Sequence, residues 1–162
     1  ATEQTSALYY KHYNLPIVIV RYSNIYGPGQ SLNNGYCGVI GKFLDLIKKN
    51  KKLTIIGDGN QTRDFTYIDD AIKITNNLLN KNHFNEIYNI STFKRTSINT
   101  LIEYIEQILN RKLDNTSIVK RDIDDIEHRI VDNSKVLKAL KCKIDYPLVK
   151  GLTKTIKYFE IF

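Results

Sequence analysis

The chain alternates between segments with apolar residues at helical spacing and short apolar runs of strand length. Residues 3–13 carry apolar and aromatic groups at helical spacing, and Asn14-Leu15-Pro16 predicts the end of that helix. The run Ile17–Val20 is continuous and β-branched, which predicts a strand buried on both faces of a parallel sheet. A helix, a short loop and a buried strand in this order are typical of an α/β fold.

The same alternation continues along the rest of the chain. Asp69 or Asp70 is predicted to cap a helix that runs through Leu79, and Ser97 is predicted to cap a strongly amphipathic helix that reaches Leu109. Strands are predicted at 53–56, 63–68 and 87–90, extended pieces at 118–121 and 129–132, and helices at 39–49, 134–140 and 148–162. The pattern predicts a mixed α/β fold in one compact body.

The charge balance favours anionic partners. The 162 residues are enough for one ordinary domain with a sizeable core. Lys and Arg number 24 against 17 Asp and Glu, so the net charge is +7, which suits phosphates but does not choose between a small diphosphate and a nucleic acid. Because no recognition-helix, RNP or zinc-finger pattern accompanies the basic residues, we expect solvated basic faces and no nucleic-acid partner.

Metal, disulfide and membrane signals are weak in this sequence. Cys37 and Cys142 lie far apart and form no C-x-x-C pair, and no His has an acid or Cys beside it at ligand spacing. We therefore expect no metal site and no disulfide framework. The longest apolar runs are too short to span a bilayer and no signal peptide is visible, so we expect no membrane partner and a cytoplasmic location.

The amino terminus lies inside a helical pattern. The chain opens with Ala1-Thr2-Glu3 and contains no Met. No helix start signal precedes these residues. We therefore expect the chain to be a fragment or a processed form of a longer protein.

Two polar side chains stand where an α/β protein binds ligands. Asn24 follows a predicted buried strand at its carboxyl end, and its amide can donate to a phosphate or sugar oxygen, or else cap a turn. Arg63 follows a Gly-Asp-Gly loop, and its guanidinium suits a pyrophosphate. The alternative for Arg63 is a structural salt bridge to Asp64 or Asp69. The pair predicts a diphosphate site.

Several segments together resemble the extended short-chain dehydrogenases/reductases of the NAD-dependent epimerase/dehydratase type. Arg21–Gln30 resembles the R-x-x-N-x-Y-G-P segment of that family, and Gly57–Ala71 resembles its G-D-G-x-Q-x-R-D-[FW]-x-Y-[IV]-x-D segment. Ile87–Ile90 is similar to its Y-N-[IVL] strand, Arg129–Lys135 to its R-x-x-D-x-S-K stretch, and Gly151-Leu152 with Thr155 to its closing helix. The ordered set covers nearly the whole chain.

The resemblance implies a fold and partners. Residues 1–35 would be the last helix and strand of a Rossmann-type, doubly wound sheet, and residues 36–162 the small α/β substrate-binding lobe. The substrate would be a nucleoside-diphosphate sugar, and NAD or NADP would be bound mainly by a missing N-terminal half. Many members are homodimers that pack through the helix that residues 1–13 would finish.

The resemblance also implies roles for individual residues. Asn24 and Arg63 would bind the diphosphate. Tyr22 and Ser23 would lie beside the nicotinamide of the cofactor.

Two further pairs complete the implied substrate site. Thr54 and Ile56 lie in a strand whose backbone pairs with the nucleotide base in the family, a role that is compatible with an ordinary core strand. Arg121 and Asp124 match an R-P-G-D segment whose Arg reaches the phosphates and whose acid reaches the nucleoside, although Asp122-Ile123 replaces Pro-Gly. Considered alone, that last segment is a solvated loop of mixed charge.

The chain lacks the catalytic signature of the family. Relatives carry a Tyr base and a Lys four residues later, whereas Tyr9-Tyr10-Lys11 has the wrong spacing. The nearest candidate for the family's G-x-x-G-x-x-G turn, the glycine cluster Gly35–Gly41, follows no strand of the right kind. We therefore expect no catalytic residue in this chain, which would be an inactive C-terminal part of an epimerase, dehydratase or decarboxylase. The alternative is a stand-alone, non-catalytic module that binds nucleotide sugars.

Overall fold

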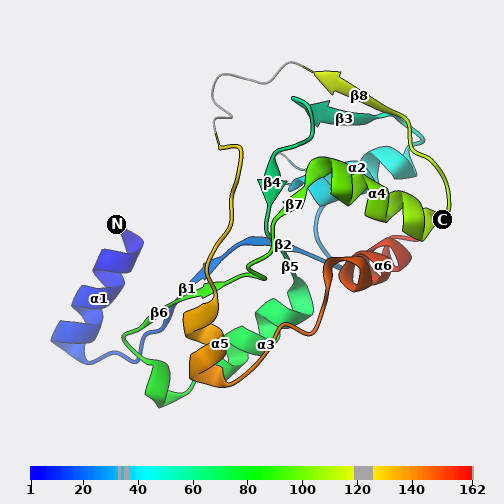
Figure 1. Ribbon diagram of the computed structural model, residues 1–162. Coiled ribbons are helices and arrows are strands. Elements are labelled where there is room, and N and C mark those ends of the chain that lie inside the picture. Colours follow the sequence, from blue (N-terminus) through cyan, green and yellow to red (C-terminus); the bar gives the residue numbers. More distant parts are fainter. Residues whose placement is uncertain (33, 35–36, 119–125, 162) are drawn as a thin grey trace.

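The fold mixes helices with short strands (Figure 1). The computed structural model describes residues 1–32, 34, 37–118 and 126–161. Its helices are α1 (Thr2–Tyr13), α2 (Val39–Lys48), α3 (Ile68–Leu78), α4 (Ile98–Leu109), α5 (Ser134–Leu140) and α6 (Leu148–Tyr158), with a 3-10 turn η1 at Lys81–His83. Its strands are β1 (Ile19–Tyr22), β2 (Asn24–Tyr26), β3 (Leu53–Ile56), β4 (Thr62–Arg63), β5 (Phe65–Tyr67), β6 (Ile87–Ile90), β7 (Thr96–Ser97) and β8 (Asn115–Ile118). The predicted α/β class is confirmed.

The strands pair across long stretches of sequence. β1 pairs with β6, β2 with β5 and β3 with β8, all in parallel, while β4 pairs with β7 in the antiparallel direction. The register places Asn24 opposite Phe65. Parallel partners need a crossover connection, and helices α3 and α4 lie within the connections that lead to β6 and β8.

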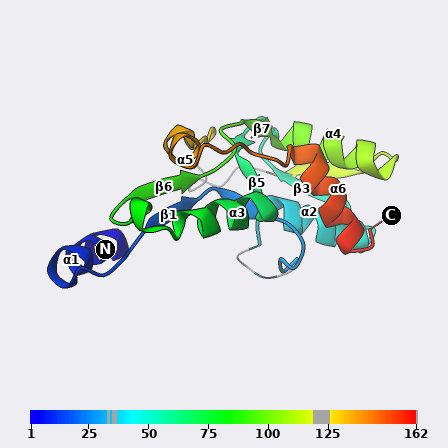
Figure 2. The same ribbon diagram turned by 90° about the horizontal axis from the view of Figure 1, so that it is seen from below.

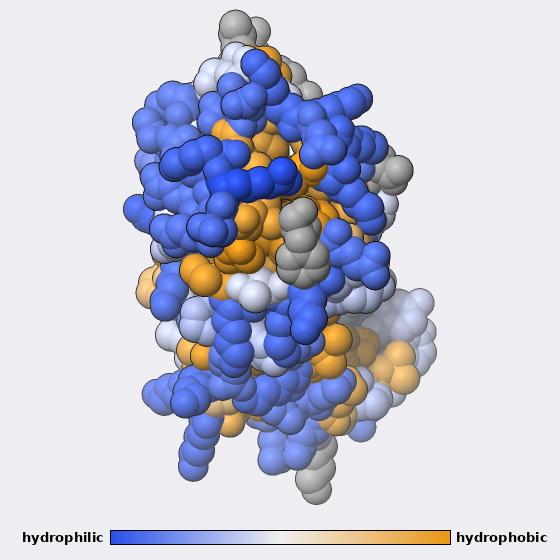
Figure 3. All heavy atoms as spheres, turned by 90° about the vertical axis from the view of Figure 1, so that its right-hand side faces the viewer, coloured by the Kyte–Doolittle hydropathy of each residue, from blue (hydrophilic) through white to orange (hydrophobic). Residues whose placement is uncertain are grey.

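The core has two parts that meet at β2. The first part packs α2, α4 and α6 against β3 and β5, and the second packs α3 and α5 against β6. Neighbouring side chains of β2 point to opposite faces, so Ile25 joins the second part and Tyr26 the first. Figure 3 shows apolar side chains in a hollow bordered by hydrophilic ones, on the face that carries the ends of α4 and α6.

Helix α1 stands apart from both parts of the core. In Figures 1 and 2 it lies at the end of the molecule opposite α6. None of its residues is buried, and Leu8, Tyr9 and Tyr13 are exposed. Its tie to the rest of the chain includes an ion pair between Glu3 and Arg21 of β1. The predicted helix at 3–13 is confirmed, and it ends where Asn14 adopts a left-handed conformation with φ 53°.

Two strand predictions need correction. The strand expected at Ile17–Val20 begins at Ile19 and continues to Tyr22, and it is not buried on both faces, because its last two residues are exposed. The strand expected at 63–68 is divided into β4 and β5, since the chain changes partners at Asp64 from β7 to β2. Of the extended piece expected at 118–121, Ile118 ends β8 and the other residues lie outside those that the structure describes; residues 129–132 belong to no helix or strand.

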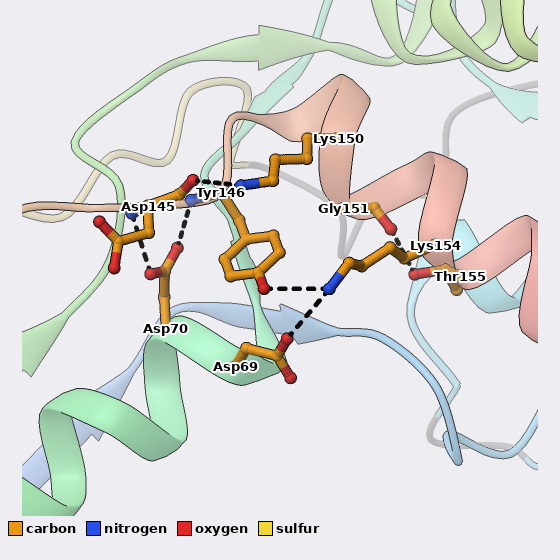
Figure 4. Close-up of polar contacts among 8 residues, drawn as sticks. All are labelled: Asp69, Asp70, Asp145, Tyr146, Lys150, Gly151, Lys154 and Thr155. Carbon is orange, nitrogen blue, oxygen red and sulfur yellow. Dashed lines mark hydrogen bonds and ion pairs between the residues drawn. The ribbon is translucent and has the colours of Figure 1, made fainter.

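The cap predicted for α3 was wrong. Its N-cap is Tyr67, without a side-chain cap bond, and Asp69 and Asp70 lie in its first turn. The buried carboxylate of Asp70 instead accepts hydrogen bonds from the backbone amides of Asp145 and Tyr146, at 3.0 Å each (Figure 4). A long-range contact has replaced the local one, and it holds the segment that leads into α6.

The other helix predictions hold within a few residues. Ser97 caps α4 as predicted, because its side chain accepts from the backbone amide of Thr100. The helices expected at 39–49 and 148–162 end at Lys48 and Tyr158. No helix in the part of the chain that the structure describes is long and apolar enough to cross a membrane.

Candidate functional site

A cavity of about 630 Å³ opens among α2, β3, β4 and the segment 126–128, a volume in the usual range for small-molecule sites. Its apolar wall comes from α2 and β3, which Figure 1 shows near one another. Its polar wall comes from the start of β2, from β4 and from residues 127 and 128. The residues that line it include Asn24, Val39, Lys42, Phe43, Leu46, Thr54, Ile55, Ile56, Asp58, Gln61, Arg63, Ile118, Glu127 and His128. The cavity can therefore hold a ligand that is apolar on one side and polar on the other.

Asn24 contributes its side chain from the first position of β2. Its Nδ2 donates to the carbonyl oxygen of Asp64 at 3.0 Å, and its backbone amide donates to the same oxygen at 3.3 Å. Asn24 therefore sits in a strand and caps no turn. An amide group has two N–H donors and an acceptor oxygen. Among the residues that the structure describes, this bond uses one donor of the Asn24 amide, so its second N–H and Oδ1 can serve a ligand.

Arg63 contributes a half-buried guanidinium from β4. Its Nη1 donates to the carbonyl oxygens of Thr62, at 2.8 Å, and Glu127, at 3.3 Å. The acids considered as salt-bridge partners have other contacts: the Asp64 carboxylate accepts from residues 92 and 93, and Asp69 lies 3.8 Å from Lys154. These carbonyl contacts hold the guanidinium at the edge of the cavity, which Arg63 lines.

The structure brings together four of the sequence-predicted substrate residues. Asn24, Arg63, Thr54 and Ile56 all line the cavity. Arg121 and Asp124 lie outside the described residues.

The two predicted cofactor residues lie outside the cavity lining. The Tyr22 hydroxyl is 2.8 Å from the Thr75 hydroxyl of α3, and the Ser23 hydroxyl donates to the Asp64 carbonyl at 2.6 Å. The Ser23 backbone amide donates to Ile90 of β6. Tyr22 faces α3 and Ser23 faces the junction of β4 and β5, and their place beside the nicotinamide stays a prediction.

Sequence reasoning missed two cationic or titratable groups in the cavity. Lys42 lies three residues after Val39 and four before Leu46, a spacing that places all three on one helix face. His128 lies beside β4, where its Nδ1 is 3.2 Å from the Thr62 hydroxyl. The helical spacing could have revealed Lys42. No local signal marks His128, because its neighbour Thr62 is distant in sequence.

The Gly-Asp-Gly loop is locked against the start of α4. Gly59 has φ 80°, and a Cβ there would lie 2.1 Å from Oδ1 of Asn99, so only glycine fits. Asn99 in turn donates from Nδ2 to the Asp58 carbonyl at 3.1 Å. This packing fixes the floor of the cavity between β3 and β4.

Two tyrosines near the site are structural. Burial raises the pKa of Tyr26 well above its ordinary value, and its hydroxyl donates to the Leu148 carbonyl at 3.1 Å. Burial also raises the pKa of Tyr67. A phenol with a raised pKa stays protonated at neutral pH and is a poor base. Among the described residues, no group of three or more His, Cys, Asp or Glu side chains is arranged to hold a metal ion.

Comparison with known proteins identifies the family of this chain. Residues 1–91 match the model of the NAD dependent epimerase/dehydratase family. The UDP-N-acetyl-alpha-D-glucosaminuronate decarboxylase of Bacillus cytotoxicus is 31% identical over 163 residues, which cover 98% of this chain and 50% of that protein. The chain belongs to the NAD dependent epimerase/dehydratase family.

Solved structures place the fold in the Rossmann-type epimerase class. The UDP-glucose 4-epimerase of Thermotoga maritima, crystallised with UDP-glucose, matches with a TM-score of 0.89 at 28% identity, over 98% of this chain and 50% of that one. The UDP-N-acetylglucosamine 4-epimerase of Methanobrevibacter ruminantium, in complex with UDP-N-acetylmuramic acid, matches with a TM-score of 0.89 at 31% identity over the same shares. The chain spans about half the length of these relatives.

Proposed function

We propose that this chain is the C-terminal, substrate-binding part of an NAD(P)-dependent nucleotide-sugar epimerase or dehydratase. It binds the nucleoside-diphosphate portion of the sugar substrate in the cavity between α2, β3 and β4. The observation that carries the proposal is the convergence of Asn24 and Arg63 on one cavity, together with Thr54 and Ile56 of β3.

The chemistry of the cavity walls supports a nucleoside diphosphate. Arg63 supplies charge-assisted hydrogen bonds to phosphate oxygens, and Asn24 supplies a neutral donor beside it. Lys42 adds a second positive charge to the lining. The apolar wall, which includes Phe43 and Leu46, suits the flat face of a base, and the backbone of β3 lies within reach of its polar edge. Solved structures of similar fold contain UDP-glucose and UDP-N-acetylmuramic acid.

The family's cofactor is a nicotinamide dinucleotide, which accepts and returns a hydride when it is bound. We propose that residues outside this chain hold most of it and that Tyr22 and Ser23 contact the nicotinamide end. Their hydroxyls already have protein partners, so the contact would use the Tyr22 ring and the backbone. Tyr146 and Lys150 have the Tyr-x-x-x-Lys spacing, but Pro147 lies between them and neither residue lines the cavity. Gly35, Gly38 and Gly41 have the G-x-x-G-x-x-G spacing, but β2 ends at Tyr26, well before them. We therefore propose that the chain is inactive alone.

The remaining assignments are part of the same proposal. The boundary of the two portions lies near residue 35, although β6 pairs with β1 across it. The full-length enzyme is a cytoplasmic homodimer that packs through α1, whose Leu8, Tyr9 and Tyr13 are exposed.

Calorimetric titration of the 162-residue chain with UDP and dTDP tests the proposal. The chain is expected to bind at least one of them. Arg63→Ala is expected to weaken that binding by about 10- to 100-fold, since a hydrogen bond to a charged group contributes about 1.5–3 kcal/mol. Arg111→Ala removes an exposed guanidinium beyond the end of α4 and is the matched control, with unchanged affinity expected. Absence of binding, or equal affinity of wild type and Arg63→Ala, would overturn the assignment.

The alternative is a stand-alone binding module, which is favoured because no Tyr is among the described residues that line the cavity. The assay that separates the two is turnover of UDP-glucose by the protein produced from the complete parent gene. Conversion of the sugar supports the enzyme, and binding without conversion supports the module.

A further inference from the structure

The buried carboxylate of Asp64 lies next in the chain to the cavity residue Arg63. Asp64 lies between β4 and β5, directly after Arg63, and is fully buried. Its Oδ1 accepts from the backbone amide of Thr92 at 2.9 Å and from the Thr92 hydroxyl at 2.6 Å. Its Oδ2 accepts from the backbone amide of Phe93 at 3.0 Å. A buried carboxylate is costly without such partners, so these bonds define its geometry.

The backbone of the same residue holds the cavity residue Asn24. The carbonyl oxygen of Asp64 accepts from Nδ2 of Asn24 at 3.0 Å, from the Asn24 backbone amide at 3.3 Å and from the Ser23 hydroxyl at 2.6 Å. Asp64 therefore connects three chain segments: the junction of β1 and β2, the junction of β4 and β5, and the loop that follows β6.

The loop that the carboxylate holds is conformationally demanding. Phe93 has φ 57°, a left-handed conformation that residues other than glycine rarely adopt. Half of its side chain is exposed, so apolar packing does little to hold it there. The hydrogen bond from its amide to Asp64 offsets the cost of this conformation. Loss of the carboxylate would release the loop and, with it, the constraint on the Asp64 backbone.

We propose that Asp64 is a positioning residue for the diphosphate site. Its carboxylate anchors the loop after β6, and this anchor holds the Asp64 carbonyl in the place where it orients the Asn24 amide. The adjacent Arg63 is aligned through the same stretch of backbone. The identity of the ligand rests on the proposed function, whereas the positioning of the Asn24 side chain by Asp64 does not depend on it.

Asp70 provides a matched control within the same chain. It is also buried and also accepts two backbone N–H bonds, from Asp145 and Tyr146 at 3.0 Å each (Figure 4). It lies in α3, outside the lining of the cavity, and its partners lead into α6. Asn substitution keeps the volume of either side chain but replaces one acceptor oxygen with an NH2 donor. The two variants thus suffer the same chemical change at different places.

The first measurement is the affinity for UDP of wild type, Asp64→Asn and Asp70→Asn, at a temperature at which circular dichroism shows all three folded. Asp64→Asn is expected to bind UDP about 10-fold more weakly, which corresponds to about 1.4 kcal/mol. Asp70→Asn is expected to lose thermal stability but to retain wild-type affinity. Equal affinity of Asp64→Asn and wild type would overturn the proposal, as would an equal loss of affinity in both variants.

The second measurement does not depend on UDP. In ¹⁵N-correlated NMR spectra, the Asn24 side-chain NH2 signals are expected to shift in Asp64→Asn and to stay in place in Asp70→Asn. Unmoved signals in both variants would refute the positioning role even if UDP binds. If wild type binds neither UDP nor dTDP, the proposed function fails while this spectrum still decides the role of Asp64.

A milder variant covers the case in which Asp64→Asn does not fold. Thr92→Val removes the hydroxyl donor to Oδ1 but leaves both backbone donors in place. It is expected to shift the same Asn24 signals in the same direction by a smaller amount. No shift in this variant would count against the anchor.

Discussion

The closing helix α6 packs so tightly on the core that Gly151 has no room for a side chain. An ideal Cβ at this position would lie 2.1 Å from the Tyr26 hydroxyl oxygen and 2.8 Å from Cδ2 of Tyr67. Both rings are buried in contact with one another, with centroids 5.6 Å apart, and the Tyr26 hydroxyl donates to the Leu148 carbonyl. Gly151→Ala therefore forces either the Tyr26 ring or α6 to move.

The cost of this change can be set against its one favourable effect. Overpacking a core costs about 1–3 kcal/mol, and breaking the buried hydrogen bond of Tyr26 adds about 1–3 kcal/mol. Alanine recovers about 1 kcal/mol because it is the better helix former. The steric terms win, and we expect Gly151→Ala to lower the free energy of unfolding by about 2–3 kcal/mol. For a domain of this size, Tm is expected to fall by about 5–10 °C.

Urea and thermal unfolding followed by circular dichroism measure this loss. Gly38→Ala is the control, because nothing lies within 4 Å of its added Cβ, and it is expected to cost less than about 1 kcal/mol as a change at a helix N-cap. A double-mutant cycle with Tyr26→Phe isolates the clash with the hydroxyl. The double variant is expected to be about 1 kcal/mol more stable than the sum of the single changes predicts. Additive effects, or an unchanged Tm for Gly151→Ala, would refute the reasoning.

Three further predictions concern other parts of the chain. Hydrogen bonds from the Lys112 ammonium and the Leu113 backbone amide lower the pKa of Glu106 below its ordinary value of 4.5. The ionised Glu106 therefore stabilises the folded chain above pH 4.5, and this stabilisation is lost as the pH falls through the lower pKa of the folded state. Glu106→Gln is expected to show a smaller loss of urea stability than wild type between neutral pH and about pH 3, and equal losses would contradict this. Burial raises the pKa of the Cys37 and Cys142 thiols, so iodoacetamide is expected to alkylate both more slowly at neutral pH in the folded chain than in urea, and equal rates would count against it. Ser97→Ala removes the cap of α4 and is expected to cost about 1 kcal/mol in urea unfolding, whereas no change would show that the cap is dispensable.

Local sequence determined most of the helices and the family. The apolar periodicity of residues 39–48 and 98–109 marks α2 and α4, and Ser97 marks the start of α4, because spacing and capping act within a turn or two. The ordered motifs place the chain in its family for the same reason, since each occupies a short stretch. These features need no knowledge of distant partners.

Contacts between distant segments decided the rest. The residues around Asp70 predicted a helix cap, but its carboxylate accepts from the backbone amides of Asp145 and Tyr146. The position of those amides depends on the tertiary fold of the segment before α6. The burial of β1 depends on which strands and helices cover it. The β-branched run Ile17–Val20 therefore predicted more burial than β1 has.

The candidate site could be predicted only in part from the sequence. The sequence supplied the residue types, an amide after a strand and a guanidinium after a glycine loop. The pairing of β2 with β5 brings Asn24 and Arg63 to one cavity, and the packing of α2 and of the segment beside β4 adds Lys42 and His128 to its walls. A cavity is formed by surfaces from several elements at once, and no stretch of one chain segment contains that information.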